Sequence, residues 1–394
     1  MGDNIQIMIV MVVYMLAVIG IGLAFAKRAN ESPEAYFLGG RTLGPWVTAM
    51  SAEASDMSGW LLMGLPGVAY WCGIADAAWT AIGLALGTYM NWLITSKRLR
   101  RYSEKAGNAI TLPEFFSNRF HEKGKLVMTI SAFFILVFFT VYAASCLVTC
   151  GKLFSTLFGL DYIPMMIVGA VFVLIYTIIG GFLAESASDF MQAVVMICAL
   201  VIIVVTGTAA AGGLGAVIEN AITIPGFLEF FGVATLLRWT GVQQVVNGTL
   251  NLERPPATAP SVLYPAWPGG LGYFGMPQVL LRFMAIRTEH ELTHSRRIAT
   301  VWVVISLIIA VFIGVVGRVL YPDALLTESS AENVFILLST NLLPPLLAGL
   351  VMAGILAATI SSSDSYLLIA ASAFSKNIYQ GLLHKKASDK QVLN

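Results

Sequence analysis

Charged residues are scarce in this chain: Asp, Glu, Lys and Arg make up 11% of its 394 residues, whereas 57% are hydrophobic. A soluble domain carries about a quarter charged residues, so the composition excludes an ordinary soluble protein. The formal net charge of only +1 gives no basis for a nucleic-acid partner. Apolar runs of about 20 residues, long enough to cross a bilayer as helices, recur instead. The sequence therefore predicts an all-α polytopic membrane protein surrounded by the lipid bilayer.

Cysteine and histidine are also rare, with four of each. Cys146 and Cys150 lie four positions apart in one apolar run, with no histidine near them. A role as small buried hydrophobes is therefore favoured over a metal or redox centre. The phosphate-loop pattern GxxxxGK and the hydrolase pattern GxSxG are missing from the sequence. We therefore expect neither an enzyme nor a bound cofactor.

The apolar runs define about nine membrane segments, approximately at residues 5–26, 46–70, 73–96, 126–151, 162–184, 189–213, 262–286, 298–320 and 345–376. Alternating their sides places 19 of the 23 Lys and Arg residues on one side of the membrane, and leaves Lys152, Arg238, Arg254 and Arg318 on the other. Basic residues collect in cytoplasmic loops. The N-terminus is therefore predicted to lie outside the cell and the C-terminus inside.

Two of these segments are interrupted. Segment 46–70 contains SAEASDMSG, and segment 262–286 contains WPGGLGYFGMP. Irregular backbone persists at membrane depth only where it lines a cavity or is buried in protein. Two interrupted spans, five apart in order, indicate inverted repeats whose broken helices meet near the bilayer midplane. We therefore expect a leucine-transporter-like inverted-repeat fold.

The domain organisation follows from this fold. Residues 1–394 form a single transporter domain that begins with an extra helix at 5–26. The first repeat is expected at 46–213 and a partial second repeat at 262–376, and a cytoplasmic tail follows at 377–394.

Acidic residues stand inside the first interrupted segment. A charged carboxylate at the bilayer centre costs about 2.5–3.5 kcal/mol on insertion scales, so it seldom lies there without a function. Asp56 either adds negative potential to a cation site or positions an ammonium group, and it can also cap a helix at the break. These roles are compatible. Glu53, one helical turn earlier, is assigned no role.

Oxygen-bearing groups suggest a cation site. Ala358, Ser361 and Ser362, in the stretch LAATISSSDS, share one helical face. Ala54 and Met57 are three apart, where an unwound turn would free their carbonyls. Neutral oxygen donors suit an alkali cation such as Na⁺ rather than zinc or copper. Close helix packing through small serines explains the same pattern, and the local sequence alone favours that explanation.

Five stretches resemble the sodium:solute symporter family, most closely its bacterial sodium/proline symporters. They are YFLGGRTLGPW (36–46), SDMSGWLLMGLPG (55–67), IYTIIGGFLA (175–184), GLGYFGMPQVLLRFMA (270–285) and the segment 356–363. The resemblance implies a secondary symporter that couples Na⁺ influx to uptake of L-proline across a bacterial plasma (inner) membrane. Na⁺ is then the coupling ion, and no further cofactor is implied.

The resemblance also implies functional positions, and it favours the cation site over simple packing. The sodium site is assigned to the carbonyls of Ala54, Met57 and Ala358 and the hydroxyls of Ser361 and Ser362. Sodium coupling and the sodium path are assigned to Asp56, Asp189 and Arg41, although loop charges or snorkelling side chains explain the last two equally well. The solute site is assigned to Ser58, Gly59, Tyr142, Tyr273 and Pro277.

Two features depart from the family pattern. Trp267 is followed by Pro268 and Gly269 before GLGYFG, and the stretch 236–266 is polar where an apolar helical lead-in is expected. Family members also continue beyond the segment ending near Lys376, so the second repeat is expected to be truncated. Three alternatives remain open: symport of a sugar, pantothenate or a short carboxylate; a solute-sensing membrane domain that does not transport; and an inactive fragment. The oligomeric state is not predicted.

Overall fold

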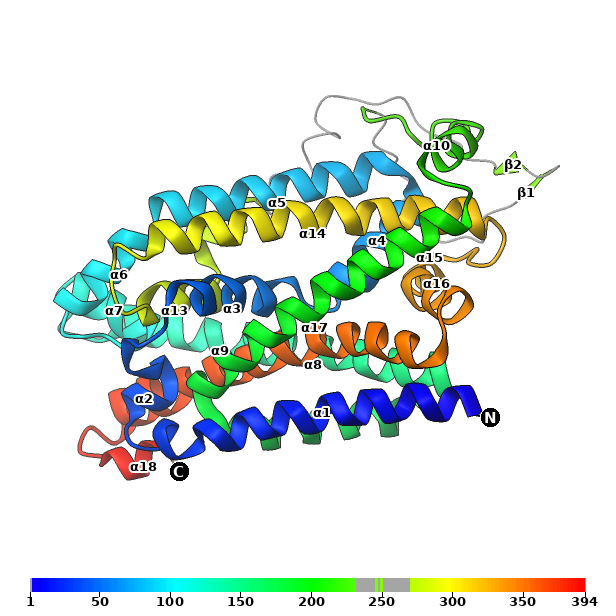
Figure 1. Ribbon diagram of the computed structural model, residues 1–394. Coiled ribbons are helices and arrows are strands. Elements are labelled where there is room, and N and C mark those ends of the chain that lie inside the picture. The colour runs from blue at the N-terminus through cyan, green and yellow to red at the C-terminus, as the bar shows by residue number, and fades with distance from the viewer. Residues whose placement is uncertain (1, 232–244, 247–248, 251–269, 394) are drawn as a thin grey trace.

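The computed structural model describes residues 2–231, 245–246, 249–250 and 270–393. Within them the chain is almost entirely helical, apart from a small antiparallel pair of strands, β1 (Val245–Val246) and β2 (Thr249–Leu250). The long helices lie side by side in one elongated bundle (Figure 1). The N-terminus lies at one end of this bundle and the C-terminus at the other, as Figure 1 shows. The expected all-α architecture is therefore confirmed.

Five helices in the described part are long and apolar enough to cross a membrane. They are α1 (Gly2–Ala29), α8 (Leu126–Phe158), α9 (Tyr162–Ala210), α14 (Leu292–Leu320), and α17 (Pro345–Ser372) with its π-helical continuation η5 (Ala373–Leu383). A further helix, α5 (Ile74–Ile94), matches the expected segment 73–96 but contains polar residues such as Asp76 and Asn91.

The expected segments 162–184 and 189–213 form one continuous element, α9. Gly181 interrupts it with φ 51° and ψ −161°, a backbone conformation that a residue without a Cβ adopts at little cost. A side chain at this position would also press against Tyr36, whose carbonyl oxygen lies 2.9 Å from the place a Cβ would occupy. The residues that the sequence places between the two spans, 185–188, are therefore helical, and the chain kinks at Gly181 instead of forming a loop.

The first interrupted segment is a broken helix, as expected. It consists of α3 (Pro45–Met57), the π-helical turn η2 (Trp60–Gly64) and α4 (Leu65–Cys72). The break falls at Ser58, whose φ of 50° and ψ of −174° end the helix. In the second interrupted segment, the 3₁₀ turn η4 (Tyr273–Gly275) precedes α13 (Pro277–Ala285), and the two meet at Met276. The part of this segment before Gly270, including Trp267 and its departure from the family pattern, lies outside the described residues.

Shorter elements lie mainly at the two ends of the bundle. The basic helix α6 (Ser96–Lys105) and α7 (Leu112–Arg119) lie at the end that holds the C-terminus (Figure 1). The helices α10 (Leu214–Ile222), α15 (Glu328–Ala331) and α16 (Val334–Leu342) lie toward the other end (Figure 1). The remaining short elements are α2 (Pro33–Leu38), η1 (Gly39–Arg41) and α18 (Asp389–Leu393).

The helix α17 lies at the centre of the packing, against α1, α3, α8 and α9. Small side chains allow this close approach, which is how helices associate in membranes. At Gly354, an added Cβ would lie 2.7 Å from the Cβ of Ala199 on α9, so no larger residue fits there. This packing brings the serine-rich stretch of α17 against the last turn of α3.

Candidate cation and solute site

The last turn of α3 presents free main-chain oxygens to α17. The final four carbonyls of a helix have no partner within that helix, and α3 ends at Met57. Ser361 of α17 satisfies one of these carbonyls, because its hydroxyl donates a hydrogen bond to the Ala54 carbonyl at 2.8 Å. The Ala54, Met57 and Ser361 residues are buried. Two segments 307 positions apart in the sequence thus meet at the predicted sodium positions.

The oxygens of α17 lie in the same buried region. The Ser361 hydroxyl also lies 3.2 Å from the Ala358 carbonyl, one turn earlier on its own helix. The neighbouring Ser362 hydroxyl is buried and has no hydrogen-bond partner among the described residues. A buried hydroxyl without a partner is unfavourable unless something else satisfies it. The Ala54 and Ala358 carbonyls and the Ser361 hydroxyl therefore meet at one helix junction, with Ser362 next along α17 and Met57 one turn after Ala54 at the end of α3.

Asp56 lies on the neighbouring side of the break, toward α13. Its Oδ1 accepts a hydrogen bond from Gln278 Nε2 at 2.9 Å. Asp56 also lines a cavity of about 260 Å³ together with Ser58, Tyr142 and Tyr273. Three of the five predicted solute residues, which come from three different helical segments, thus surround one hollow beside the carboxylate.

The other two predicted solute residues lie differently. Gly59 lines a second, adjoining cavity, and a Cβ there would lie 2.6 Å from Thr149 Cγ2, so packing on α8 alone explains why this residue is glycine. Pro277 is buried at the first turn of α13 and lines neither cavity. Its fixed φ suits this position, where the missing N–H would have no partner in any case. The structure thus does not bring Pro277 to the hollow.

Several side chains of this region were not singled out from the sequence. Trp60 lines both cavities. The Tyr366 ring stacks on the Tyr142 ring, with centroids 4.4 Å apart and an interplanar angle of 12°. Asn91 Nδ2 donates to the Tyr273 carbonyl at 2.8 Å and so anchors η4. Trp60 could have been predicted from the sequence, because it directly follows Ser58 and Gly59. Tyr366 and Asn91 could not, because their roles depend on contacts between distant segments.

Asp189 belongs to a buried ionic cluster. Arg282 of α13 pairs with Glu185 and, at 3.0 Å from its Nη2 to Oδ2, with Asp189. Ser51 of α3 donates to the same Asp189 oxygen at 2.7 Å, and Ser365 of α17 donates to Glu185 Oε1 at 2.5 Å. Arg282 was counted from the sequence among the loop charges of the basic side. That assignment is wrong, since its side chain is fully buried among α3, α9 and α17.

The ionic cluster connects to the sodium residues through α17. The Ser365 hydroxyl lies 2.8 Å from the Ser361 carbonyl, and Arg282 Nη2 donates to Ser365 Oγ at 2.9 Å. A continuous series of oxygens therefore runs from Ala54 through Ser361 and Ser365 to the carboxylates on α9. Glu53 lies elsewhere, buried on α3, where its Oε1 accepts from Trp92 Nε1 at 3.1 Å.

Arg41 lies away from the predicted sodium residues, and its side chain hydrogen-bonds to segments at one end of the bundle. Its guanidinium donates to the Met284 carbonyl at 2.7 Å and to the Ala109 carbonyl at 2.9 Å. Its Nε donates to Asn108 Oδ1 at 3.0 Å. Burial lowers the pKa of Arg41, and the nearby Arg100 guanidinium lowers it further. The contacts fix the end of α13 to the loop between α6 and α7, at the end of the bundle that holds the C-terminus.

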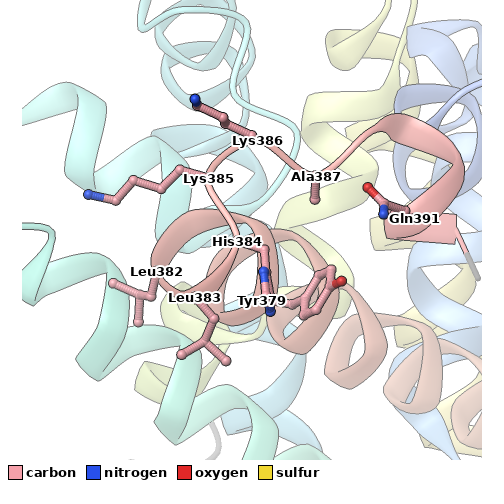
Figure 2. Close-up of a pocket in the computed structure, with 8 residues that line it drawn as sticks. All are labelled: Tyr379, Leu382, Leu383, His384, Lys385, Lys386, Ala387 and Gln391. Atoms are coloured by element: carbon pink, nitrogen blue, oxygen red, sulfur yellow. The ribbon is translucent and has the colours of Figure 1, made fainter.

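A larger hollow lies apart from all of these residues. It has a volume of about 540 Å³ and is formed by η5 and the segment that follows it. Figure 2 shows Lys385 and Lys386 extending away from the ring pair of Tyr379 and His384. None of the predicted site residues lines this hollow. Size alone therefore does not identify the site.

Comparison with known proteins shows which family shares these features. The family model described as "Sodium:solute symporter family" matches residues 36–394. The sodium/proline symporter of Escherichia coli (strain K12) is 39% identical over 393 residues, covering 97% of this chain and 72% of the relative. The osmoregulated proline transporter OpuE of Bacillus subtilis (strain 168) is 37% identical, covering 99% of this chain and 74% of the relative. The sodium/proline symporter of Staphylococcus aureus (strain bovine RF122 / ET3-1) is 39% identical, covering 96% and 69%.

A solved structure confirms the fold. The substrate-bound, outward-open state of a Na⁺-coupled sialic acid symporter superposes with a TM-score of 0.80, covering 98% of this chain and 78% of that chain. At 20% sequence identity, this likeness concerns the fold alone. The expected leucine-transporter-like architecture of a multi-pass membrane protein is therefore confirmed. On the evidence of the family model and of relatives matched over nearly its whole length, the chain belongs to the sodium:solute symporter family.

Proposed function

We propose that this chain is a secondary active symporter that couples inward movement of Na⁺ to uptake of L-proline. The observation that carries the proposal is the identity of 37–39%, over nearly the whole chain, with three bacterial transporters named for proline. The arrangement of the site supports it, because oxygens suited to an alkali ion adjoin a small hollow lined by aromatic side chains and the Asp56 carboxylate.

The sodium ion is proposed to bind where α3 ends. The carbonyls of Ala54, Met57 and Ala358 and the hydroxyls of Ser361 and Ser362 are hard neutral donors, which suit an alkali cation. In this structure the Ser361 hydroxyl donates a hydrogen bond to the Ala54 carbonyl at 2.8 Å. On ion binding this proton would turn away, and both oxygens would face the cation. The unpartnered Ser362 hydroxyl would then gain the ligand that the helices do not provide.

The solute is proposed to occupy the hollow beside Asp56. Tyr142 and Tyr273 both line this hollow, and aromatic faces attract an ammonium group while packing on an apolar ring. The carboxylate of a zwitterion needs a hydrogen-bond donor, which the hydroxyl of Ser58 can supply at the edge of this hollow. Gly59 and Pro277 are proposed to act by shaping the two helix breaks, because neither has a side-chain polar group.

Coupling is proposed to arise because both sites share the break in α3. The Ala54 and Met57 carbonyls precede Ser58, and the solute hollow begins at Asp56, so ordering one side of the break orders the other. Sodium that tightens proline binding by some factor must itself bind more tightly by the same factor when proline is present. Asp189 is proposed to receive the ion on its way inward along the oxygens of Ser361 and Ser365. Arg41 is proposed to hold the cytoplasmic loops at the end of that path.

The domain arrangement remains part of the proposal. We propose one transporter domain over residues 1–394, with the first inverted repeat at 46–213 and a partial second repeat at 262–376. The helix at 5–26 precedes the repeats, and the segment 377–394 forms a cytoplasmic tail. The break in α3 and the break before α13 would then be equivalent positions of the two repeats.

Uptake into proteoliposomes tests the function. Labelled proline should accumulate when an inward Na⁺ gradient is imposed and should not accumulate when K⁺ replaces Na⁺. The variant Asp56→Asn is the matched control, because it keeps the size of the side chain and removes the charge next to both sites. Proline accumulation that is independent of the Na⁺ gradient, or normal proline accumulation by the Asp56→Asn variant, would contradict the proposal.

A further inference from the structure

The side chain of Gln278 is fully buried on α13 and reaches the last turn of α3. Its Nε2 donates to Asp56 Oδ1 at 2.9 Å, since an ionised carboxylate can only accept. Its Oε1 is buried and has no hydrogen-bond partner among the described residues. Burying an amide that is only half satisfied is unfavourable, so packing alone would favour an apolar residue at this position. Gln278 therefore has a role that packing does not explain.

The two polar side chains of α13 share one face of this helix. Gln278 and Arg282 are four positions apart, and the other residues of α13 are apolar. Arg282 Nη1 also donates to the Gln278 carbonyl at 3.0 Å. Gln278 reaches Asp56 on α3, whereas Arg282 Nη2 reaches Ser365 Oγ on α17 at 2.9 Å. One face of α13 thus contacts both helices that carry the proposed sodium ligands.

These contacts close a ring that includes the proposed sodium residues. Ser365 lies one helical turn after Ser361, whose hydroxyl donates to the Ala54 carbonyl at 2.8 Å. Ala54 and Asp56 both belong to the last turn of α3, and from Asp56 the ring returns through Gln278 and α13 to α17. Close-packed interiors transmit displacements. A shift of the α3 carbonyls relative to α17 therefore also changes the position of Asp56 relative to Gln278.

A second wall of the solute hollow belongs to the same stretch as Gln278. Tyr273 and Met276 line this hollow together with Asp56, and α13 begins directly after Met276. Gln278 lies two residues after Met276, and it lines neither the hollow nor the adjoining cavity. The hydrogen bond from Gln278 to Asp56 therefore fixes the two walls relative to each other from behind.

We propose that Gln278 is a positioning residue that transmits sodium binding to the solute hollow. Its amide holds the Asp56 carboxylate between the break in α3 and the start of α13. Ordering of the α3 carbonyls by sodium then also sets the position of the wall that carries Tyr273. This inference rests on the proposed function for the identity of both ligands, and it adds the residue through which they act on each other.

The ratio of two dissociation constants isolates this role. Binding of labelled proline to the purified full chain is measured in K⁺ alone and at saturating Na⁺, and the ratio of the two constants is the factor by which Na⁺ tightens proline binding. Gln278→Met keeps the length of the side chain and removes the donor. It should lower this factor toward one, by up to about tenfold, while the constant measured in K⁺ changes less than about threefold. Gln278→His, which retains a ring N–H, should restore most of the factor.

Gln192→Met is the matched control, because Gln192 is an equally buried glutamine on α9 that lines neither cavity, and it should leave the factor unchanged. An unchanged factor in Gln278→Met overturns the inference, whether or not proline binds more weakly. A loss that Gln278→His does not restore also overturns it, since shape rather than the hydrogen bond would then matter. If Gln278→Met does not fold, Gln278→Glu, which has the same size and no donor when ionised, takes its place with the same expected outcome. Absence of a Na⁺ effect in the unmodified chain would contradict the proposed function, whereas a normal effect there and in the Gln278 variants contradicts this inference alone.

Discussion

Ser361 and Ser362 are adjacent residues of α17 with different surroundings. The Ser361 hydroxyl lies 2.8 Å from the Ala54 carbonyl and 3.2 Å from the Ala358 carbonyl. The Ser362 hydroxyl is buried without a hydrogen-bond partner in the described part of the chain. One hydroxyl thus joins the two helices, and the other is available for a ligand.

Removal of both hydroxyls tests their role in sodium binding. The double variant Ser361→Ala, Ser362→Ala should raise the Na⁺ concentration for half-maximal proline uptake by about tenfold or more, because a polar contact to a charged group is worth about 1.5–3 kcal/mol. The measurement is the Na⁺ dependence of uptake in proteoliposomes, at equal amounts of reconstituted protein.

Ser363→Ala provides the matched control, because the Ser363 hydroxyl bonds within its own helix to the Thr359 carbonyl at 2.6 Å. This variant should keep the sodium dependence of the unmodified protein. An unchanged Na⁺ requirement in the double variant would exclude both hydroxyls as ligands.

At the scale of elements, the break between α3 and η2 depends on how closely it approaches α8. A Cβ at Gly59 would lie 2.6 Å from Thr149 Cγ2, which is closer than such atoms come in real structures. A residue larger than glycine therefore fits at position 59 only if α8 moves or the Thr149 side chain becomes smaller.

Gly59→Ala should accordingly impair solute binding by displacing Ser58 and Tyr142 from each other. A combined variant, Gly59→Ala with Thr149→Ala, should recover much of the affinity, since the second change removes the atoms that collide. Equilibrium binding of labelled proline to both proteins checks this. Full affinity in the single variant, or no recovery in the double variant, would contradict the packing explanation.

The ionic cluster around Arg282 ties several elements together. Its guanidinium reaches Glu185 and Asp189 on α9, Ser51 on α3 and Ser365 on α17. Removing one partner of a buried ion pair leaves an uncompensated charge, which typically costs about 3–5 kcal/mol.

Arg282→Met should therefore lower the free energy of unfolding by about 3–5 kcal/mol, measured by chemical denaturation of the purified protein in detergent. Arg101→Met, which breaks an exposed pair, should leave the unfolding midpoint almost unchanged. A midpoint for Arg282→Met equal to that of the unmodified protein would show that the cluster does not hold these helices together.

For the molecule as a whole, the sequence predicted those features of the fold and site that depend on the local pattern of residues. Scarcity of charge predicted membrane helices, and SAEASDMSG predicted the break that falls at Ser58. The spacing of Ala358, Ser361 and Ser362 suggested the oxygen-lined face that meets Ala54. The resemblance to the family was needed to prefer a cation site over packing, because small serines at this spacing serve both purposes.

What the sequence did not predict depends on contacts between distant segments. Gln278 lies 222 positions from Asp56, and Arg282 lies 93 positions from Asp189. The local pattern around Arg282 does not distinguish it from a charged loop residue, and only the packing of α13 against α3, with the side-chain contacts to α9, shows that it is buried. The sequence also predicted a boundary between spans at residues 185–188, whereas these residues are helical and α9 kinks a few residues earlier, at Gly181.

The central claim is that sodium and proline bind on the two sides of one helix break and therefore bind cooperatively. Equilibrium binding of labelled proline to the purified chain, measured across a range of Na⁺ concentrations, tests it most directly. We predict that Na⁺ lowers the dissociation constant of proline and that proline lowers that of Na⁺ by the same factor. Proline affinity that is the same with and without Na⁺ would contradict the account.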